Sequence, residues 1–381
     1  MGRCAVIIGD VEKVPRTISF FAIIAVAFNL LSSWLTVAST LLLGLSHGGP
    51  VTVVYGLIVM LIMYGAVALS LSEMAARYPT AGGQYHWTAL LAPDKWKCGL
   101  SYCCGSINAI GRVAMTASIL YIVAILSHGM IAFYDLSYTI ELTYNIFFLN
   151  KAPWTHKLGF IISLASFFVI SITCLALTQP KQSNYYVWRD FINHTGWESN
   201  GLVFLLGLIN PTLGFGGLDG AVHLAEDSVS AAKTVPRALC YSLVIGFATS
   251  FFFVVSMLYC VQDIDAAITS RTGVPIHEFW FQATRSGAAA TTFMASMTAA
   301  AFIASIGSVQ SKFGWLVNAM VVSWAAFLIV IFSFPVQQPV TPGSMNYTSL
   351  VLGIMALLSV LNWFLYARKH YQGPNITLLV D

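Results

Sequence analysis

Charged residues are scarce in this chain. Asp, Glu, Lys and Arg together make up 9% of its 381 residues, against about 25% in soluble domains. Hydrophobic residues make up 57%, and the mean hydropathy is +0.77. Charge-free stretches recur along the chain, at 17–72, 113–134, 158–180, 199–218, 238–262, 286–311 and 313–367. Since a helix needs about 20 apolar residues to cross a bilayer, the chain is predicted to be an all-α polytopic membrane protein embedded in lipid.

Signatures of several other functions are also missing. The sequence has no nucleotide-binding P-loop motif, which argues against an ATP-driven pump, and no His-Glu-x-x-His zinc motif. Its seven cysteines lack metal-ligand spacing, and its net charge of +3 is spread over the loops. We therefore expect a protein that is not an enzyme, with no catalytic residues, no metal site, no cofactor and no nucleic-acid partner.

Nine spans are clear and a tenth segment, 130–149, is ambiguous because it contains two acidic residues. The nine spans are 18–44, 51–72, 100–127, 158–178, 201–224, 237–261, 287–309, 314–334 and 347–367. If 130–149 crosses, 13 Lys and Arg residues face the cytoplasm and 4 face outside; otherwise the split is 10 to 7. The positive-inside rule favours the crossing. The chain is then a single transmembrane domain, with a cytoplasmic N-terminus at 1–16, a membrane bundle at 17–367 and a cytoplasmic tail at 368–381.

Four blocks in a characteristic order carry a family resemblance. "LSEMAARYPTAGGQYHWTALLAP" (71–93) has a Glu, then a proline, then Gly-Gly-x-Tyr, and it resembles the signature of the amino acid–polyamine–organocation (APC) transporters. Residues 29–51, 214–238 and 334–374 each resemble a block of the fungal amino acid/GABA/choline permeases within that superfamily. The resemblance extends over most of the chain, from about residue 17 to 374.

The resemblance implies an inverted-repeat bundle of the leucine-transporter type, usually with twelve helices. This chain has nine or ten spans, so parts of that bundle are expected to be missing. Residues 130–149 resemble a shrunken fourth helix, and the sequence jumps near 310–312 to a stretch that resembles the eleventh helix, which suggests an internal deletion. Arg112 stands where the family usually has an aromatic residue.

The resemblance also implies a function. We expect a secondary transporter in the plasma membrane or an internal (vacuolar or endomembrane) membrane. Its partner is a small-molecule substrate, an amino acid or a related amine such as GABA or choline, and a proton is the expected coupling ion. The departures from the family pattern leave an alternative open: a truncated, transport-dead paralogue or a regulatory, receptor-like protein.

"LINPTLGFGGLDGAVHLAED" (208–227) begins as a membrane-grade apolar run and is then interrupted by Pro211, four glycines and Asp219. Proline and glycine are the poorest helix formers, and an intramembrane charge is costly. In the family that this chain resembles, the first and sixth helices are broken near the midplane of the membrane, where their backbone groups bind substrate. We therefore predict two discontinuous helices, broken near 31–36 and 214–219. The candidate substrate-binding residues are Asn29, Ser32, Ser33, Trp34, Phe215, Gly216, Gly217 and Asp219.

Four of these candidates have a structural alternative. Asp219 either N-caps the second half-helix or meets a substrate amine or the coupled proton. Phe215 is a packing residue or a lid over the substrate. Ser32 and Ser33 line the site or pack between helices, and Trp34 offers a ring face to a cation.

A second group of residues lies at the cytoplasmic end of the second span and is not expected to touch substrate. These gate or structural residues are Glu73, Pro79, Gly82, Gly83 and Glu226. The proline and glycines predict a sharp turn. The two glutamates either pair with nearby basic residues and hold an inward gate shut, or form a solvated surface, where ion pairs contribute little.

Overall fold

The computed structural model describes residues 7–8, 19–80, 82–109, 111, 122, 126, 153–225, 228–268, 270, 274–305, 348–367 and 375–376. Nearly all of them lie in helices or in the short turns between helices, which confirms the all-α fold class. The N-terminal helices are α1 (Phe20–Leu31), α2 (Ser33–Ser39), α3 (Leu41–Ser46), α4 (Gly49–Arg77) and α5 (Gln84–Leu91), and residues 97–109 are helical. The middle of the chain forms α8 (Pro153–Leu177), α9 (Asn184–Arg189), α10 (Asn200–Gly207), α11 (Ile209–Leu213) and the 3₁₀-helix η1 (Leu218–Leu224).

The remaining elements complete the bundle. They are α12 (Ala231–Cys260), α13 (Ile264–Ile268), α14 (Pro275–Thr284), α15 (Gly287–Ser305), α17 (Thr348–Asn362) and the π-helical turn η2 (Trp363–Ala367). Two strands of two residues each, β1 (Ile7–Ile8) and β2 (Asn375–Ile376), pair in parallel.

Five helical stretches in the described part of the chain are long and apolar enough to cross a membrane. They are Phe20–Ser39, Gly49–Arg77, His156–Leu177, Asn200–Val222 and Ala231–Cys260. Each overlaps a span expected from the sequence, and α15 and α17 with η2 occupy the places of two more. Four sequence features lie outside the described residues: the segment 130–149, the span 314–334, the junction at 310–312 and Arg112.

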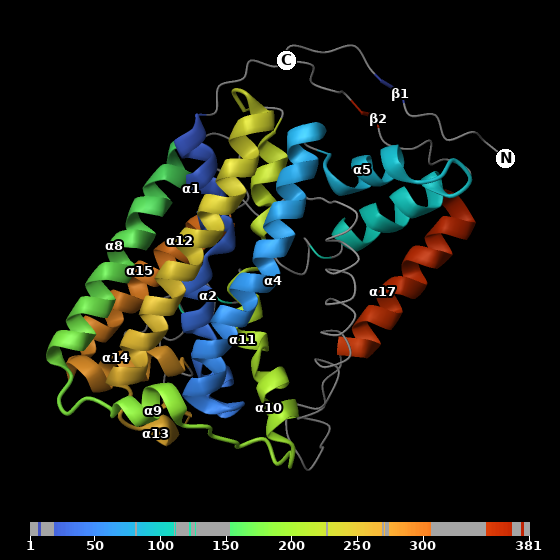
Figure 1. The fold of residues 1–381 in the computed structure, drawn as a ribbon. Coiled ribbons are helices and arrows are strands. Elements are labelled where there is room, and N and C mark those ends of the chain that lie inside the picture. The colour runs from blue at the N-terminus through green and yellow to red at the C-terminus, as the bar shows by residue number, and fades with distance from the viewer. Residues whose placement is uncertain are drawn as a thin grey trace.

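Helix α12 runs through the bundle and packs along α4, α1, α2 and α8 (Figure 1). Its close approach to α2 depends on Gly246, because a Cβ at that position would lie 2.5 Å from the Oγ of Ser33. Aromatic side chains fill the layer beside this contact: Trp34 and Phe253 are fully buried, with ring centroids 5.3 Å apart. The broken first helix is therefore held in the middle of the bundle rather than at its lipid-facing surface.

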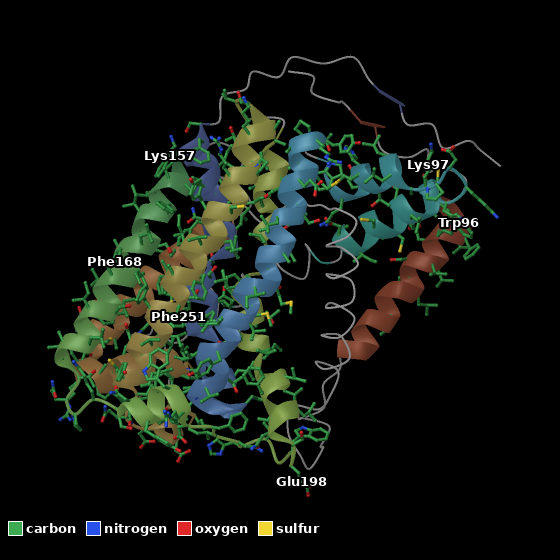
Figure 2. The ribbon with its side chains drawn as sticks, in the orientation of Figure 1. Trp96, Lys97, Lys157, Phe168, Glu198 and Phe251 are labelled. Atoms are coloured by element: carbon green, nitrogen blue, oxygen red, sulfur yellow. The ribbon has the colours of Figure 1, made fainter. Side chains whose placement is uncertain are left out.

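The two ends of the bundle differ in the residues that they carry. Lys97 and Lys157, which the charge distribution assigns to the cytoplasm, lie at one end, and Glu198, assigned to the outside, lies at the opposite end (Figure 2). The short helices α9, α10 and α13 gather at the end that carries Glu198 (Figure 1). We call this the outer end. Side chains cap the N-termini of helices there. For example, the Ser199 hydroxyl caps α10 by accepting from the backbone N–H of Leu202 at 3.4 Å.

Candidate functional site

The first helix is broken at Ser32, inside the predicted range 31–36. Helix α1 ends at Leu31, and Ser32 adopts a left-handed conformation (φ 44°, ψ 37°) before α2 begins at Ser33. The backbone N–H of Ser32 donates to the Phe28 carbonyl at 2.9 Å, and its hydroxyl donates to the Asn29 carbonyl. These bonds compensate for part of the cost of a left-handed, non-glycine residue. The predicted break is confirmed.

The second helix is broken over residues 214–217, again within its predicted range. Helix α11 ends at Leu213, a turn follows, and Gly217 has a left-handed φ of 83°. The chain then continues as η1 instead of returning to an α-helix. Glycine tolerates this conformation without steric cost, and this accounts for glycine at position 217.

The glycines also bring the two breaks together. A Cβ at Gly214 would lie 2.6 Å from Val37 and 3.4 Å from the Ser33 carbonyl oxygen. A Cβ at Gly220 would lie 2.2 Å from Leu30. Residues on both sides of the second break therefore contact residues on both sides of the first, at distances that no larger side chain allows.

Asn29 and Trp34 are directed toward α8 in this conformation. The Asn29 amide donates to the His156 carbonyl at 2.7 Å, and the Trp34 indole N–H donates to the Ser163 hydroxyl at 2.8 Å. The Trp34 ring lies against Phe253, and against Phe167 at 6.4 Å between centroids. Both side chains thus serve in packing between α1, α2 and α8, and their contact with a substrate stays a prediction.

Ser33 is fully buried against Gly246, and its hydroxyl has no hydrogen-bond partner in the described part of the chain. Phe215 is also fully buried, and its ring stacks on Tyr64 of α4 with centroids 5.5 Å apart. Asp219 is half-buried and interacts electrostatically with the same tyrosine. Tyr64 was not predicted from the sequence. It packs on Phe215 and interacts electrostatically with the Asp219 carboxylate at the second break.

One expectation for Asp219 is wrong. The N-cap position of η1 is Gly217, which has no side chain to accept a capping hydrogen bond. The left-handed glycine starts the helix two residues early, so Asp219 falls within the first turn rather than before it. A carboxylate there still lies near the positive end of the helix dipole, but Asp219 does not occupy the N-cap position. Gly216 directly precedes Gly217, and its N–H donates to the Leu213 carbonyl at 3.2 Å.

Asn210 is a further residue that sequence reasoning missed. It is fully buried on α11, and its amide donates to the Val37 carbonyl at 3.0 Å and to the Thr40 hydroxyl at 2.8 Å. The sequence feature that could have identified it is the polar amide side chain within the apolar run 201–213. A buried amide is costly unless it is hydrogen-bonded, so its presence there predicts a specific partner on another helix.

The turn at the inner end of α4 has the predicted form. Pro79 is buried, and Gly83 (φ 49°, ψ −115°) precedes α5. The Thr80 hydroxyl accepts from the Gly83 N–H at 3.2 Å. A Cβ at Gly82 would lie 1.9 Å from the His86 ring, so this glycine is required by close packing within the turn.

Glu73 pairs with Arg77 one helical turn away at 3.0 Å, and about two thirds of each side chain is exposed (64% and 68%). Because both residues belong to α4, this pair does not join two helices, which favours the solvated-surface interpretation. Glu226, the other predicted gate carboxylate, lies outside the described residues.

Comparison with known proteins agrees with this architecture. The profile of the family described as "Amino acid permease" matches residues 18–311. A choline transporter from Saccharomyces cerevisiae is 28% identical, over 94% of this chain and 83% of the relative. The amino-acid permease BAT1 of Arabidopsis thaliana is 22% identical, over 98% and 96%. A 7-keto 8-aminopelargonic acid transporter from S. cerevisiae is 26% identical, over 71% and 58%.

The family profile, the relatives and the apolar helices all indicate an integral membrane protein. The family match covers most of the chain and includes both broken helices. The chain therefore belongs to the amino acid permease family of the APC superfamily and is a transmembrane transporter for amino acids or related amines.

Proposed function

We propose that the chain is a secondary transporter that binds the ammonium group of its substrate between the two helix breaks and is driven by a proton gradient. The observation that carries this proposal is the close approach of the breaks, where Gly214 and Gly220 pack on residues either side of Ser32. Irregular backbone is tolerated at membrane depth only where it is buried in protein or lines a cavity. Transport requires no chemical step, so no catalytic residue is assigned.

The charge at the site favours an ammonium group. Helix α1 ends at the first break, and a helix C-terminus carries a partial negative charge. Asp219 adds a carboxylate at the second break. A substrate ammonium would complement both, and this group is common to amino acids, GABA and choline.

The remaining candidate residues would complete the site around these charges. Ser32 and Ser33 offer hydroxyls, and Gly216 and Gly217 allow a ligand to approach the backbone closely. Asn29, Trp34 and Phe215 would line the same region once their packing contacts in this conformation rearrange as the site opens. Choline is the first substrate to test, because a relative with 28% identity is named a choline transporter.

A second candidate is a transport-dead paralogue, and two observations favour it. The alignment with the choline transporter extends over 466 positions, more than the 381 residues of this chain, so part of the relative stands opposite gaps. The family match also ends at residue 311, beside the suspected deletion at 310–312. Loss of two helices there would preserve the orientation of the later spans, but it would remove part of the scaffold.

Uptake of radiolabelled choline, GABA and amino acids into a permease-deficient host separates the two candidates. We expect saturable uptake of at least one of these amines, increasing as the external pH falls. Absence of uptake for all of them, with the protein present in the membrane, would favour the transport-dead paralogue. Uptake that is independent of the proton gradient would remove the coupling proposal alone.

A further inference from the structure

Asn210 links the two broken helices by side-chain hydrogen bonds, whereas their glycines link them by close packing. Both hydrogens of its amide are used on the first broken helix: one bonds the Val37 carbonyl and the other the Thr40 hydroxyl. The bonded residues are 173 and 170 positions apart in the sequence. The side chain is fully buried, so neither bond competes with solvent.

The acceptors of these bonds lie where α2 ends. The last carbonyls of a helix have no partner within the helix, and Val37 is in the final turn of α2 (Ser33–Ser39). Thr40 follows in a non-helical conformation (φ −108°, ψ 13°), and its hydroxyl donates in turn to the Thr36 carbonyl at 2.8 Å. The Thr40 N–H bonds the Thr36 and Ala38 carbonyls, and Asn210 adds a partner for the Val37 carbonyl between them.

The packing around Asn210 brings α11 against both α2 and α3. A Cβ at Gly44 of α3 would lie 2.7 Å from the Val53 side chain and 3.2 Å from the Asn210 Cβ, so this glycine lets α3 pack closely against both α4 and α11. Gly214 lies one turn further along, where an added Cβ would be 2.6 Å from Val37. Two successive turns of the second broken helix thus contact the same segment of the first, one by hydrogen bonds and one by close packing.

We infer that Asn210 is a positioning residue that ties the outer halves of the two broken helices into one unit. It does not touch substrate. It fixes the distance between the break at Ser32 and the break at 214–217. The outer halves of the two helices then move as one unit when the site between the breaks opens or closes. The inference rests on the proposed function only where uptake is measured.

A cysteine pair reports this tie directly. Val37→Cys with Gly214→Cys places a thiol on each broken helix at a close contact between their outer halves. The pair is built in a background that lacks the cysteines that are free in the described part of the chain: Cys103, Cys104, Cys174, Cys240 and Cys260. The rate of disulfide formation under mild oxidation is measured in membranes, first in this parent and then with Asn210→Leu added.

Removing the amide should slow cross-linking by about tenfold, because two hydrogen bonds no longer hold the helices in register. Thr40→Val removes one acceptor only and should give an intermediate rate. Thr212→Val is the matched control on α11: among the described residues its hydroxyl reaches the Met60 sulfur alone, at 3.4 Å, so the rate should not change. An unchanged rate in Asn210→Leu would overturn the inference.

Uptake gives a second test that simple misfolding would not reproduce. The reference is the uptake of the reduced parent, which already carries both cysteine substitutions at the breaks. Oxidation to the 37–214 disulfide should not lower uptake below this reference, because by the inference it joins segments that move together. In Asn210→Leu, uptake should fall while the membrane level persists, and the disulfide should restore it. Loss of uptake on cross-linking the parent would contradict the inference. If the parent transports none of the amines, the proposed function fails, and the cross-linking rates still decide the role of Asn210.

Discussion

At the scale of single residues, the first break depends on a serine rather than a glycine. A left-handed conformation costs about 1–2 kcal/mol for an L-residue other than glycine. Ser32 recovers part of this cost because its hydroxyl donates to the Asn29 carbonyl, and its backbone N–H still bonds Phe28. The second break has Gly217 in the same conformation without that cost. The two breaks thus reach similar geometry by different chemistry.

Asp219 can be tested at this scale by Asp219→Asn, which keeps the size of the side chain and removes its charge. Because Gly217, and not Asp219, is the N-cap residue of η1, the change should leave the fold and the membrane level as they are. If the carboxylate meets the substrate ammonium or carries the coupled proton, we expect uptake to fall at least about tenfold. Uptake with an unchanged rate and pH profile would reject both charge roles.

At the scale of helices, the sequence was sufficient for the positions of the breaks and insufficient for their neighbours. Pro211, the glycines and the polar residues near Ser32 interrupt long apolar runs, so the breaks could be predicted from local pattern alone. The partners of Asn29 and Trp34 lie 127 and 129 residues away on α8. Such contacts depend on how helices pack, which periodicity does not encode, and the role of Asn210 was missed for the same reason.

Helix α14, near the outer end, contains a buried histidine whose protonation should weaken the fold. His277 is 2% exposed, and burial lowers its pKa below the ordinary value of 6.5. The neutral ring is the form favoured in the folded state. Its contribution to stability is therefore full above pH 6.5 and is lost as the pH falls below that value toward the folded-state pKa.

We expect the thermal midpoint of the purified protein to fall when the pH is lowered from about 7.5 to about 5. The fall should be smaller in His277→Phe, which cannot be protonated. His194→Gln is the matched control, because His194 is exposed on the loop between α9 and α10, and it should behave like the unchanged chain. An equal fall in the unchanged chain and in His277→Phe would show that another group is responsible.

At the scale of the whole molecule, the charge distribution predicts which end of the bundle faces the cytoplasm. Lys97 and Lys157 lie at one end and Glu198 at the other, in agreement with the 13-to-4 split of basic residues. The split also predicts that 130–149 crosses the membrane. If that segment did not cross, the loop at 225–236 would face the opposite side.

Glycosylation mapping tests this orientation. A sequon introduced in the loop at 225–236 should remain unmodified, because the loop is predicted to be cytoplasmic. Its modification would place the loop outside and overturn the predicted topology, without affecting the family assignment or the positions of the breaks.

The central claim for the molecule is that the second break, with the first beside it, is the substrate site of a working transporter. The most direct measurement is amine uptake by Gly217→Val compared with Gly65→Val at equal membrane level. Gly217 is left-handed (φ 83°), and a β-branched side chain there is strained, whereas a Cβ at Gly65 meets nothing within 4 Å. The account predicts that uptake is lost in Gly217→Val and kept in Gly65→Val. Normal uptake by Gly217→Val would contradict it.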